Sequence, residues 1–284
     1  MQTEDLTFFS GPALRLAARL YVPNVGVDRH AGIVFCHGFG GVKEGTPPGL
    51  STRLAQHGYH VLTFDYRGFG GSEGARSVLN PAEQIDDAVH AVEFLSRRPG
   101  LTCVGIYGTS FGGGIALAAA CRHTRVRCGM VAVPVVAGRQ WLQSIMRWYE
   151  FLQLEQRAMD AIARKAQTGE IETADRFDIM IPDPYSRSRY QQPFPMAIET
   201  FFHVLNHNPI AEVRTLERPF AVIGVDGDPL VPVQQAKDLH NRLGGPKQII
   251  IFRGTNHYAV YEELLEQVAG KATAWYDAHL ISEE

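Results

Sequence analysis

The chain has 284 residues, 45% of them hydrophobic and 20% charged, which suits one large α/β domain or two small domains with a buried core. Its formal net charge of −3 gives no electrostatic basis for binding nucleic acid or an anionic membrane surface. The N-terminal stretch MQTEDLTFF lacks the features of a signal peptide and no apolar run is long enough for a transmembrane helix, so we expect a cytoplasmic protein with no membrane partner.

Short apolar runs alternate with helix-like stretches along the chain, which is typical of a parallel sheet covered by helices. The run AGIVFCHG does not alternate between apolar and polar residues, so it predicts a strand buried on both faces. The runs interpreted as strands are 31–38, 61–66, 102–108, 127–136, 219–225 and 247–252. The stretches interpreted as helices are 50–58, 81–98, 111–123, 231–245 and 260–280.

Residues 138–216 interrupt this rhythm, because they contain no strand-like apolar run. They begin with several aromatic residues, continue as a helical stretch to Lys165, and pass into a Pro- and Arg-rich section. The segment is too long for an ordinary connection between sheet elements. We therefore expect a single α/β core, formed by residues 1–137 and 217–284, with a mainly helical cap (residues 138–216) inserted into it.

The pattern Gly-x-Ser-x-Gly occurs twice, around Ser72 and around Ser110. A serine nucleophile of this kind needs a strand before it and a helix directly after it, with small residues on either side so that the backbone can turn sharply. Ser110 has the run TCVGIYG before it and FGGGIALAAA after it, whereas Ser72 stands in a loop. Ser110 is therefore the candidate nucleophile, and Ser72 is expected to bond to local backbone.

Three further stretches accompany this turn: HGFGG at 37–41, FDYRGFGGS at 64–72 and DPLVP at 228–232. With the serine motif, they show that the chain resembles the α/β-hydrolase superfamily from about residue 20 to the C-terminus. The combination is most similar to the capped serine esterase, dienelactone-hydrolase and acyl-peptidase-like members. The resemblance implies an α/β-hydrolase fold, with a mostly parallel central sheet flanked by helices.

A serine hydroxyl needs a general base within hydrogen-bond reach, usually a histidine oriented by a carboxylate. The order in the family is serine, acid, histidine. His257 follows the last predicted strand and is the candidate base. Asp226 and Asp228 both follow the run 219–225. Asp228 matches the family's acid segment and is the preferred acid, with Asp226 as the alternative.

The oxyanion hole is expected to use the N–H of Phe111, one residue past the nucleophile, and an N–H from the HGFGG loop. The resemblance implies that Phe39 supplies the second donor, and Gly40 is the alternative. His37 is expected to shape this loop. Asp65, Arg67 and Ser72 are expected to form a structural network beneath the site.

The aromatic and aliphatic residues Trp141, Ile145, Trp148 and Leu152 recur at helical spacing. Such a stripe usually packs as helix core. The alternative is that it lines a substrate pocket, to which we assign Gly40, Trp141, Trp148 and Tyr190.

No metal and no cofactor are expected. His203 and His207 are four residues apart, but no third ligand is placed to complete a metal site. The four cysteines lie in or beside apolar runs without zinc-like spacing, which favours buried reduced thiols.

These residues predict a cofactor-free serine hydrolase of a small-molecule substrate. A carboxylic ester is the first expectation, followed by a lactone, thioester or amide. One alternative is hydrolysis of a carbon–carbon bond in a diketone by the same three residues. Another is a non-catalytic ligand receptor on this fold. The sequence leaves open the substrate and the oligomeric state, including a homo-oligomer.

Overall fold

A central sheet of eight strands organises the part of the chain described by the computed structural model, which is residues 1–11, 13–180, 184–189, 194–254 and 256–281. The strand order is β1-β2-β4-β3-β5-β6-β9-β10, and all neighbouring pairs from β4 to β10 are parallel. The strands are β1 (Gln2–Ser10), β2 (Leu14–Val22), β3 (Ala31–Cys36), β4 (Tyr59–Phe64), β5 (Cys103–Thr109), β6 (Val126–Ala132), β9 (Phe220–Val225) and β10 (Lys247–Phe252). The predicted α/β fold with a mostly parallel sheet is confirmed.

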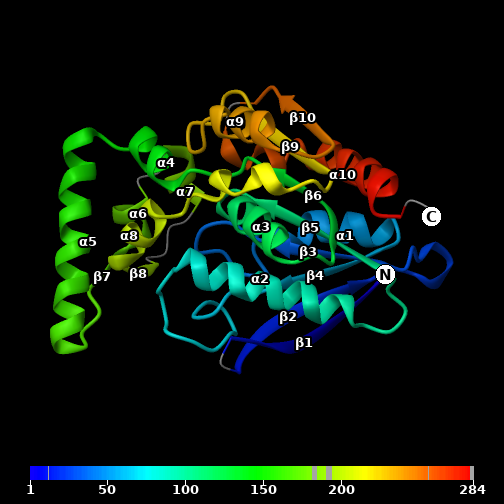
Figure 1. The fold of residues 1–284 in the computed structure, drawn as a ribbon, viewed down its shortest axis with the longest axis horizontal. Helices are drawn as coiled ribbons and strands as arrows, with labels where there is room; N and C mark the ends of the chain where they lie inside the picture. The colour runs from blue at the N-terminus through cyan, green and yellow to red at the C-terminus, as the bar shows by residue number, and fades with distance from the viewer. Residues whose placement is uncertain (12, 181–183, 190–193, 255, 282–284) are drawn as a thin grey trace.

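Helices cover both faces of this sheet (Figure 1). Those of the core are α1 (Pro47–Gln56), α2 (Pro81–Ser96), α3 (Phe111–Arg122), α9 (Gln234–Arg242) and α10 (Leu265–His279). One apolar cluster joins one sheet face to α2, α3 and α9, and a second joins the other face to α1 and α10. No helix in the described ranges is both long and apolar enough to cross a bilayer.

The N-terminal hairpin of β1 and β2 was not predicted. The two strands pair antiparallel from Gln2↔Val22 to Ser10↔Leu14, and β2 then pairs antiparallel with β4. Alternate residues of β2 are buried, namely Leu16, Ala18 and Leu20. This period of two is typical of a strand with one buried face, so the signal was present in the sequence.

The C-terminal helix was predicted to begin near residue 260 but starts at Leu265. The residues just before it, His257–Tyr261, form a separate short 3-10 turn, η4. This turn sets His257 apart from the helix that follows it.

The segment between β6 and β9, for which we keep the name cap, consists mainly of helices. These are α4 (Gly138–Ile145), α5 (Trp148–Thr168), α6 (Arg176–Ile179), α7 (Pro184–Arg189) and α8 (Glu199–Leu205), followed by short 3-10 helices at Pro209–Ala211 and Val213–Thr215. Beside these helices the segment has one short strand pair, in which β7 (Thr173–Asp175) and β8 (Pro195–Ala197) run antiparallel. Figure 1 shows α5 at the left edge of the molecule, away from the sheet.

The chain leaves the core for the cap and returns from it at one place. The Gly138 N–H donates to the carbonyl of His207 at 2.8 Å, and the Ile210 N–H donates to the carbonyl of Val136 at 3.2 Å. These two backbone hydrogen bonds join the beginning of the segment to its end.

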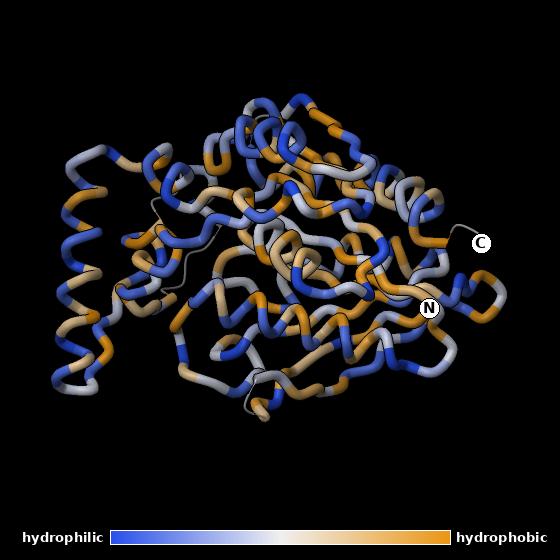
Figure 2. The backbone as a smooth tube through the Cα atoms, viewed as in Figure 1, coloured by the Kyte–Doolittle hydropathy of each residue, from blue (hydrophilic) through white to orange (hydrophobic). Residues whose placement is uncertain are grey.

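The predicted apolar stripe from Trp141 to Leu152 does not lie on one helix. Met146 is extended, with φ −126° and ψ 153°, and separates α4 from α5. Trp141 is only 1% exposed, but Trp148 is 62% exposed, so the two indoles have different surroundings. The buried face of α5 instead carries Phe151, which packs on α8, and hydrophobic and hydrophilic residues alternate along its turns (Figure 2).

Candidate active site

Ser110 stands at the sharp turn between β5 and α3. Its backbone adopts φ 54° and ψ −129°, a conformation that L-residues rarely adopt and that costs about 1–3 kcal/mol. Glycine is required on both sides: a Cβ at Gly108 would lie 2.4 Å from the carbonyl oxygen of Gly112, and one at Gly112 would lie 2.3 Å from the carbonyl oxygens of Cys36 and His37. The neighbouring backbones approach so closely that a side chain at Gly108 or Gly112 would prevent this turn from forming.

The structure brings Ser110, His257 and Asp228 together in one hydrogen-bonded row. Nε2 of His257 lies 2.9 Å from Oγ of Ser110, and its Nδ1 lies 2.6 Å from Oδ2 of Asp228. The other carboxylate oxygen of Asp228 accepts from the N–H groups of Leu230 and Val231, each at 2.8 Å. All three side chains are buried. The arrangement suits proton transfer from the serine to the imidazole.

Asp226, the alternative acid, is used elsewhere. Its Oδ1 accepts from the N–H of Gly254 at 3.2 Å. This bond ties the end of β9 to the loop that leads from β10 towards His257. The geometry therefore pairs Asp228, and not Asp226, with the imidazole.

A contact that the sequence did not predict fixes the turn that carries His257. The hydroxyls of Thr109 and Tyr261 are 2.6 Å apart, and Thr109 is fully buried directly before Ser110. The carboxamide oxygen of Asn256 accepts from the N–H of Tyr258 at 2.8 Å and caps the start of the same turn. Both ends of the His257 turn are thus anchored.

The HGFGG loop lies directly against the serine. A Cβ at Gly38 would stand 3.1 Å from Cβ of Ser110. Within the loop, the Gly41 N–H donates to the Gly38 carbonyl at 3.1 Å, and Nδ1 of His37 donates to the same carbonyl at 3.1 Å. Burial lowers the pKa of His37, which favours the neutral ring.

The predicted oxyanion donors, Phe39 and Phe111, are neighbours. Their rings meet edge to face with centroids 5.6 Å apart. Phe111 is the first residue of α3, so its N–H belongs to the first turn, whose N–H groups have no acceptor within the helix. A helix N-terminus also carries partial positive charge, which suits an oxyanion beside Ser110.

Of the four residues predicted to line a pocket, the three that the structure describes do not all lie in one place. Gly40, at φ +59°, faces the cap, since a Cβ there would meet the ring of Phe194 at 3.4 Å. Trp141 lies beside Phe39 and Phe111, with ring centroids 6.1 Å from each. Trp148 is exposed at the start of α5 and stacks on Phe151. Tyr190 lies outside the described residues.

Beneath the site, Asp65 connects two loops. Its buried carboxylate accepts from the backbone N–H of Lys43 at 2.7 Å, from Nζ of Lys43 at 3.1 Å, and from the N–H of Gly71 at 2.9 Å. Ser72 donates to the Asp65 carbonyl at 2.6 Å and accepts from the Ala17 N–H at 2.9 Å. Ser72 therefore holds its loop to β2, and its hydroxyl bonds local backbone as expected.

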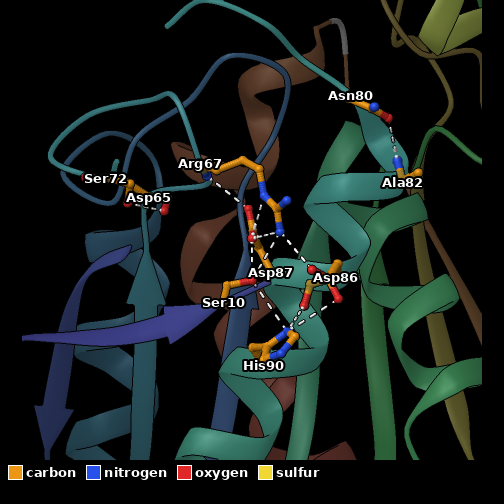
Figure 3. A network of polar contacts seen from close by, with 9 residues as sticks. All are labelled: Ser10, Asp65, Arg67, Ser72, Asn80, Ala82, Asp86, Asp87 and His90. Carbon is orange, nitrogen blue, oxygen red and sulfur yellow. Dashed lines mark hydrogen bonds and ion pairs between the residues drawn. The ribbon is translucent and has the colours of Figure 1, made fainter. Parts of the chain in front are cut away.

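Arg67 forms a second network, centred on an aspartate that the sequence analysis did not single out (Figure 3). Asp87 of α2 is fully buried and accepts from Nη2 of Arg67 at 2.6 Å, from its backbone N–H at 3.0 Å, and from Ser10 at 2.6 Å. The outer carboxylate of Asp86 also binds Arg67, at 2.8 Å. The helical spacing of the apolar residues does not single out Asp87, because its burial depends on Ser10 and Arg67 of other elements.

No group of three or more metal-ligating side chains occurs among the described residues. His207 follows the end of α8 and is buried with its ring 5.0 Å from that of Phe111. Burial lowers its pKa to about 3. The four cysteines are free, and burial raises the pKa of Cys36 to about 12, which leaves this thiol unreactive.

Comparisons with known proteins place this geometry in a family. A family model described as serine aminopeptidase, S33, matches residues 28–263. An uncharacterized 31.7 kDa protein of Escherichia coli is 26% identical over 280 residues, covering 93% of this chain and 96% of its own length. The thiohydrolase aneE of Aspergillus aculeatus is 26% identical over 279 residues, covering 90% of this chain and 86% of its own length. The α/β-hydrolase GrgF of Penicillium superposes with a TM-score of 0.86 at 19% identity, covering 99% of this chain and all of its own.

Proposed function

This chain belongs to the serine aminopeptidase S33 family, within the α/β-hydrolase superfamily, and we propose that it is a serine hydrolase that cleaves a small-molecule carboxylic ester or thioester. The observation that carries the proposal is the buried row in which Ser110 Oγ, His257 and Asp228 are joined at 2.9 and 2.6 Å. The thioester is included because one relative is named a thiohydrolase.

In the proposed reaction, His257 Nε2 takes the proton of Ser110 as Oγ attacks the acyl carbon. Asp228 accepts a hydrogen bond from Nδ1–H, which fixes the tautomer and stabilises the imidazolium. The N–H groups of Phe111 and Phe39 bind the tetrahedral oxyanion. Each such donor is typically worth about 10²–10³ in rate.

The imidazolium then gives its proton to the leaving alcohol or thiol, and an acyl group remains on Ser110. Water, deprotonated by His257, attacks this acyl-enzyme through a second tetrahedral intermediate. Collapse of that intermediate releases the carboxylic acid and returns the proton to Ser110.

The first experiment is labelling of the purified protein with a fluorophosphonate probe, followed by peptide mass spectrometry. An adduct on Ser110 is expected, because the probe reacts with activated serines. Folded protein with no adduct at Ser110 would contradict the proposal and favour a ligand receptor.

Turnover of matched acyl compounds then identifies the bond. The set is a p-nitrophenyl ester, the thioester of the same acid, the corresponding anilide, and a diketone. Hydrolysis of the ester or thioester above the other two is expected, whereas hydrolysis of the diketone alone would support carbon–carbon cleavage instead.

A further inference from the structure

Trp141 of the cap contacts both halves of the site at once. Its indole Nε1–H donates to the carbonyl oxygen of Leu230 at 2.8 Å, in the loop that carries Asp228. Its ring also lies 6.1 Å from the rings of Phe39 and Phe111. With 1% exposure, the side chain is enclosed between the acid loop and the oxyanion side.

The acceptor, Leu230, is also bound from the other side. Its N–H donates to Oδ1 of Asp228 at 2.8 Å, and its carbonyl accepts from Trp141. The two backbone polar groups of one residue thus link the indole to the carboxylate. Because Oδ1 of Asp228 is held in this way, Oδ2 faces Nδ1 of His257 at 2.6 Å.

A second set of bonds keeps Trp141 in place. The side-chain oxygen of Gln235, in α9, accepts from the N–H groups of Val136 and Ala137 at 2.9 and 3.0 Å. The backbone N–H of Trp141 in turn donates to the Ala137 carbonyl at 2.9 Å. The start of α4 is therefore fastened to α9, the helix that follows the acid loop.

We propose that Trp141 is a positioning residue for the serine hydrolysis proposed above, on which this inference rests. It acts through Leu230 on Asp228 and does not touch the reacting atoms. Removing the indole N–H leaves the Leu230 carbonyl buried without its donor, and the loop relieves this cost by moving towards water. The carboxylate that orients His257 moves with it.

Trp141→Phe tests the proposal, and Trp275→Phe is the matched control, because Trp275 is also a buried indole but lies in α10 against His279. A small misplacement of catalytic groups is costly, so we expect Trp141→Phe to lower the rate of fluorophosphonate labelling at Ser110, and kcat, by about tenfold or more. KM should change little, because the proposed role concerns the orientation of Asp228 and not substrate binding. Trp275→Phe should match the wild type. Equal labelling of Trp141→Phe and wild type would overturn the proposal.

A double mutant separates positioning from general loss of structure. If Trp141 acts through Asp228, Trp141→Phe should cost little further activity in the Asp228→Asn background, because coupled residues are not additive. The same fractional loss in both backgrounds would show a role independent of Asp228 and sink the inference.

Should Trp141→Phe fail to fold, replacing Trp141 with benzothienylalanine keeps the ring shape and substitutes sulfur for the indole N–H. The same loss of labelling is expected, and unchanged labelling would contradict the proposal. Failure of the proposed function is distinguishable, because it leaves the wild type itself unlabelled at Ser110.

Discussion

The hydroxyls of Thr109 and Tyr261 lie 2.6 Å apart, so the residue before the serine is bonded to the last residue of the turn that begins at His257. Tyr261→Phe removes this bond and leaves the buried Thr109 hydroxyl to find another partner. We expect kcat to fall about three- to tenfold, as a net hydrogen bond of about 1 kcal/mol implies. Thr109→Ser keeps the hydroxyl and should retain activity. Steady-state hydrolysis of the preferred ester checks both, and full activity in Tyr261→Phe would show that the turn is held by other contacts.

The two Gly-x-Ser-x-Gly serines should respond in opposite ways. Ser110→Ala is expected to lower kcat by about 10⁴ or more and to abolish labelling, with the fold retained. Ser72→Ala should keep labelling but lose about 1–3 kcal/mol of unfolding free energy, because its buried hydroxyl bonds Asp65 and Ala17. Urea denaturation and probe labelling of both variants measure this contrast. Labelling that survives in Ser110→Ala would disprove the assignment.

The two aspartates after β9 provide a second matched pair. Asp228→Asn presents an amide to Nδ1 of His257 and should lower kcat by about 10⁴. Asp226→Asn keeps an oxygen for the Gly254 N–H and should leave kcat close to that of the wild type. The kinetics of the two variants decide between these carboxylates, and the reverse order of effects would make Asp226 the acid.

Asp87 and Asp86 test the network beneath the site. Asp87→Asn leaves the largely buried guanidinium of Arg67 without its main counter-charge, so the unfolding free energy should fall by about 3–5 kcal/mol. Asp86 is 43% exposed, and Asp86→Asn should cost less than about 1 kcal/mol. Chemical denaturation at neutral pH measures both. Equal losses would mean that the inner pair contributes no more than the outer one.

The buried His207 is expected to make the protein less stable in acid. Burial holds its folded-state pKa at about 3, below the ordinary 6.5, so below pH 6.5 the unfolded chain takes up a proton that the folded chain does not. The free energy of unfolding therefore falls as the pH drops from about 6.5 towards 3, by ~2 kcal/mol from this residue at pH 5. Between pH 7 and pH 5, the free energy of unfolding of His207→Asn should therefore fall by about 2 kcal/mol less than that of the wild type. Urea denaturation of both proteins at each pH measures this difference, and the interval from pH 7 to 8 is the internal control. The same dependence of stability on pH in both proteins would refute the prediction.

Local patterns predicted the six parallel strands, and they distinguished Ser110 from Ser72. The strands β3 and β5 are uninterrupted apolar runs, as expected of strands buried on both faces. Ser110 differed from Ser72 by its strand and helix neighbours, which a reader of the sequence can see. The hairpin of β1 and β2 also had a local signal, in the alternation of β2, that was not used.

Contacts between distant residues could not be predicted in this way. Trp141 meets Leu230 across 89 residues, and Thr109 meets Tyr261 across 152. Each depends on which faces of separate elements meet, and periodicity carries no information about that. The break between α4 and α5 likewise has no Gly or Pro to mark it, so the stripe from Trp141 to Leu152 read as one helix.

The hydrogen bond between Val136 and Ile210 joins the place where the chain leaves the core for the cap to the place where it returns. Because the free energy of closing a loop grows only slowly with its length, the intervening segment can lengthen, shorten or be exchanged without disturbing the pairing of β6 with β9. The cap can thus change in evolution while the sheet that holds Ser110 stays intact. Members of a family with this arrangement can therefore differ in the inserted segment while they share the same core.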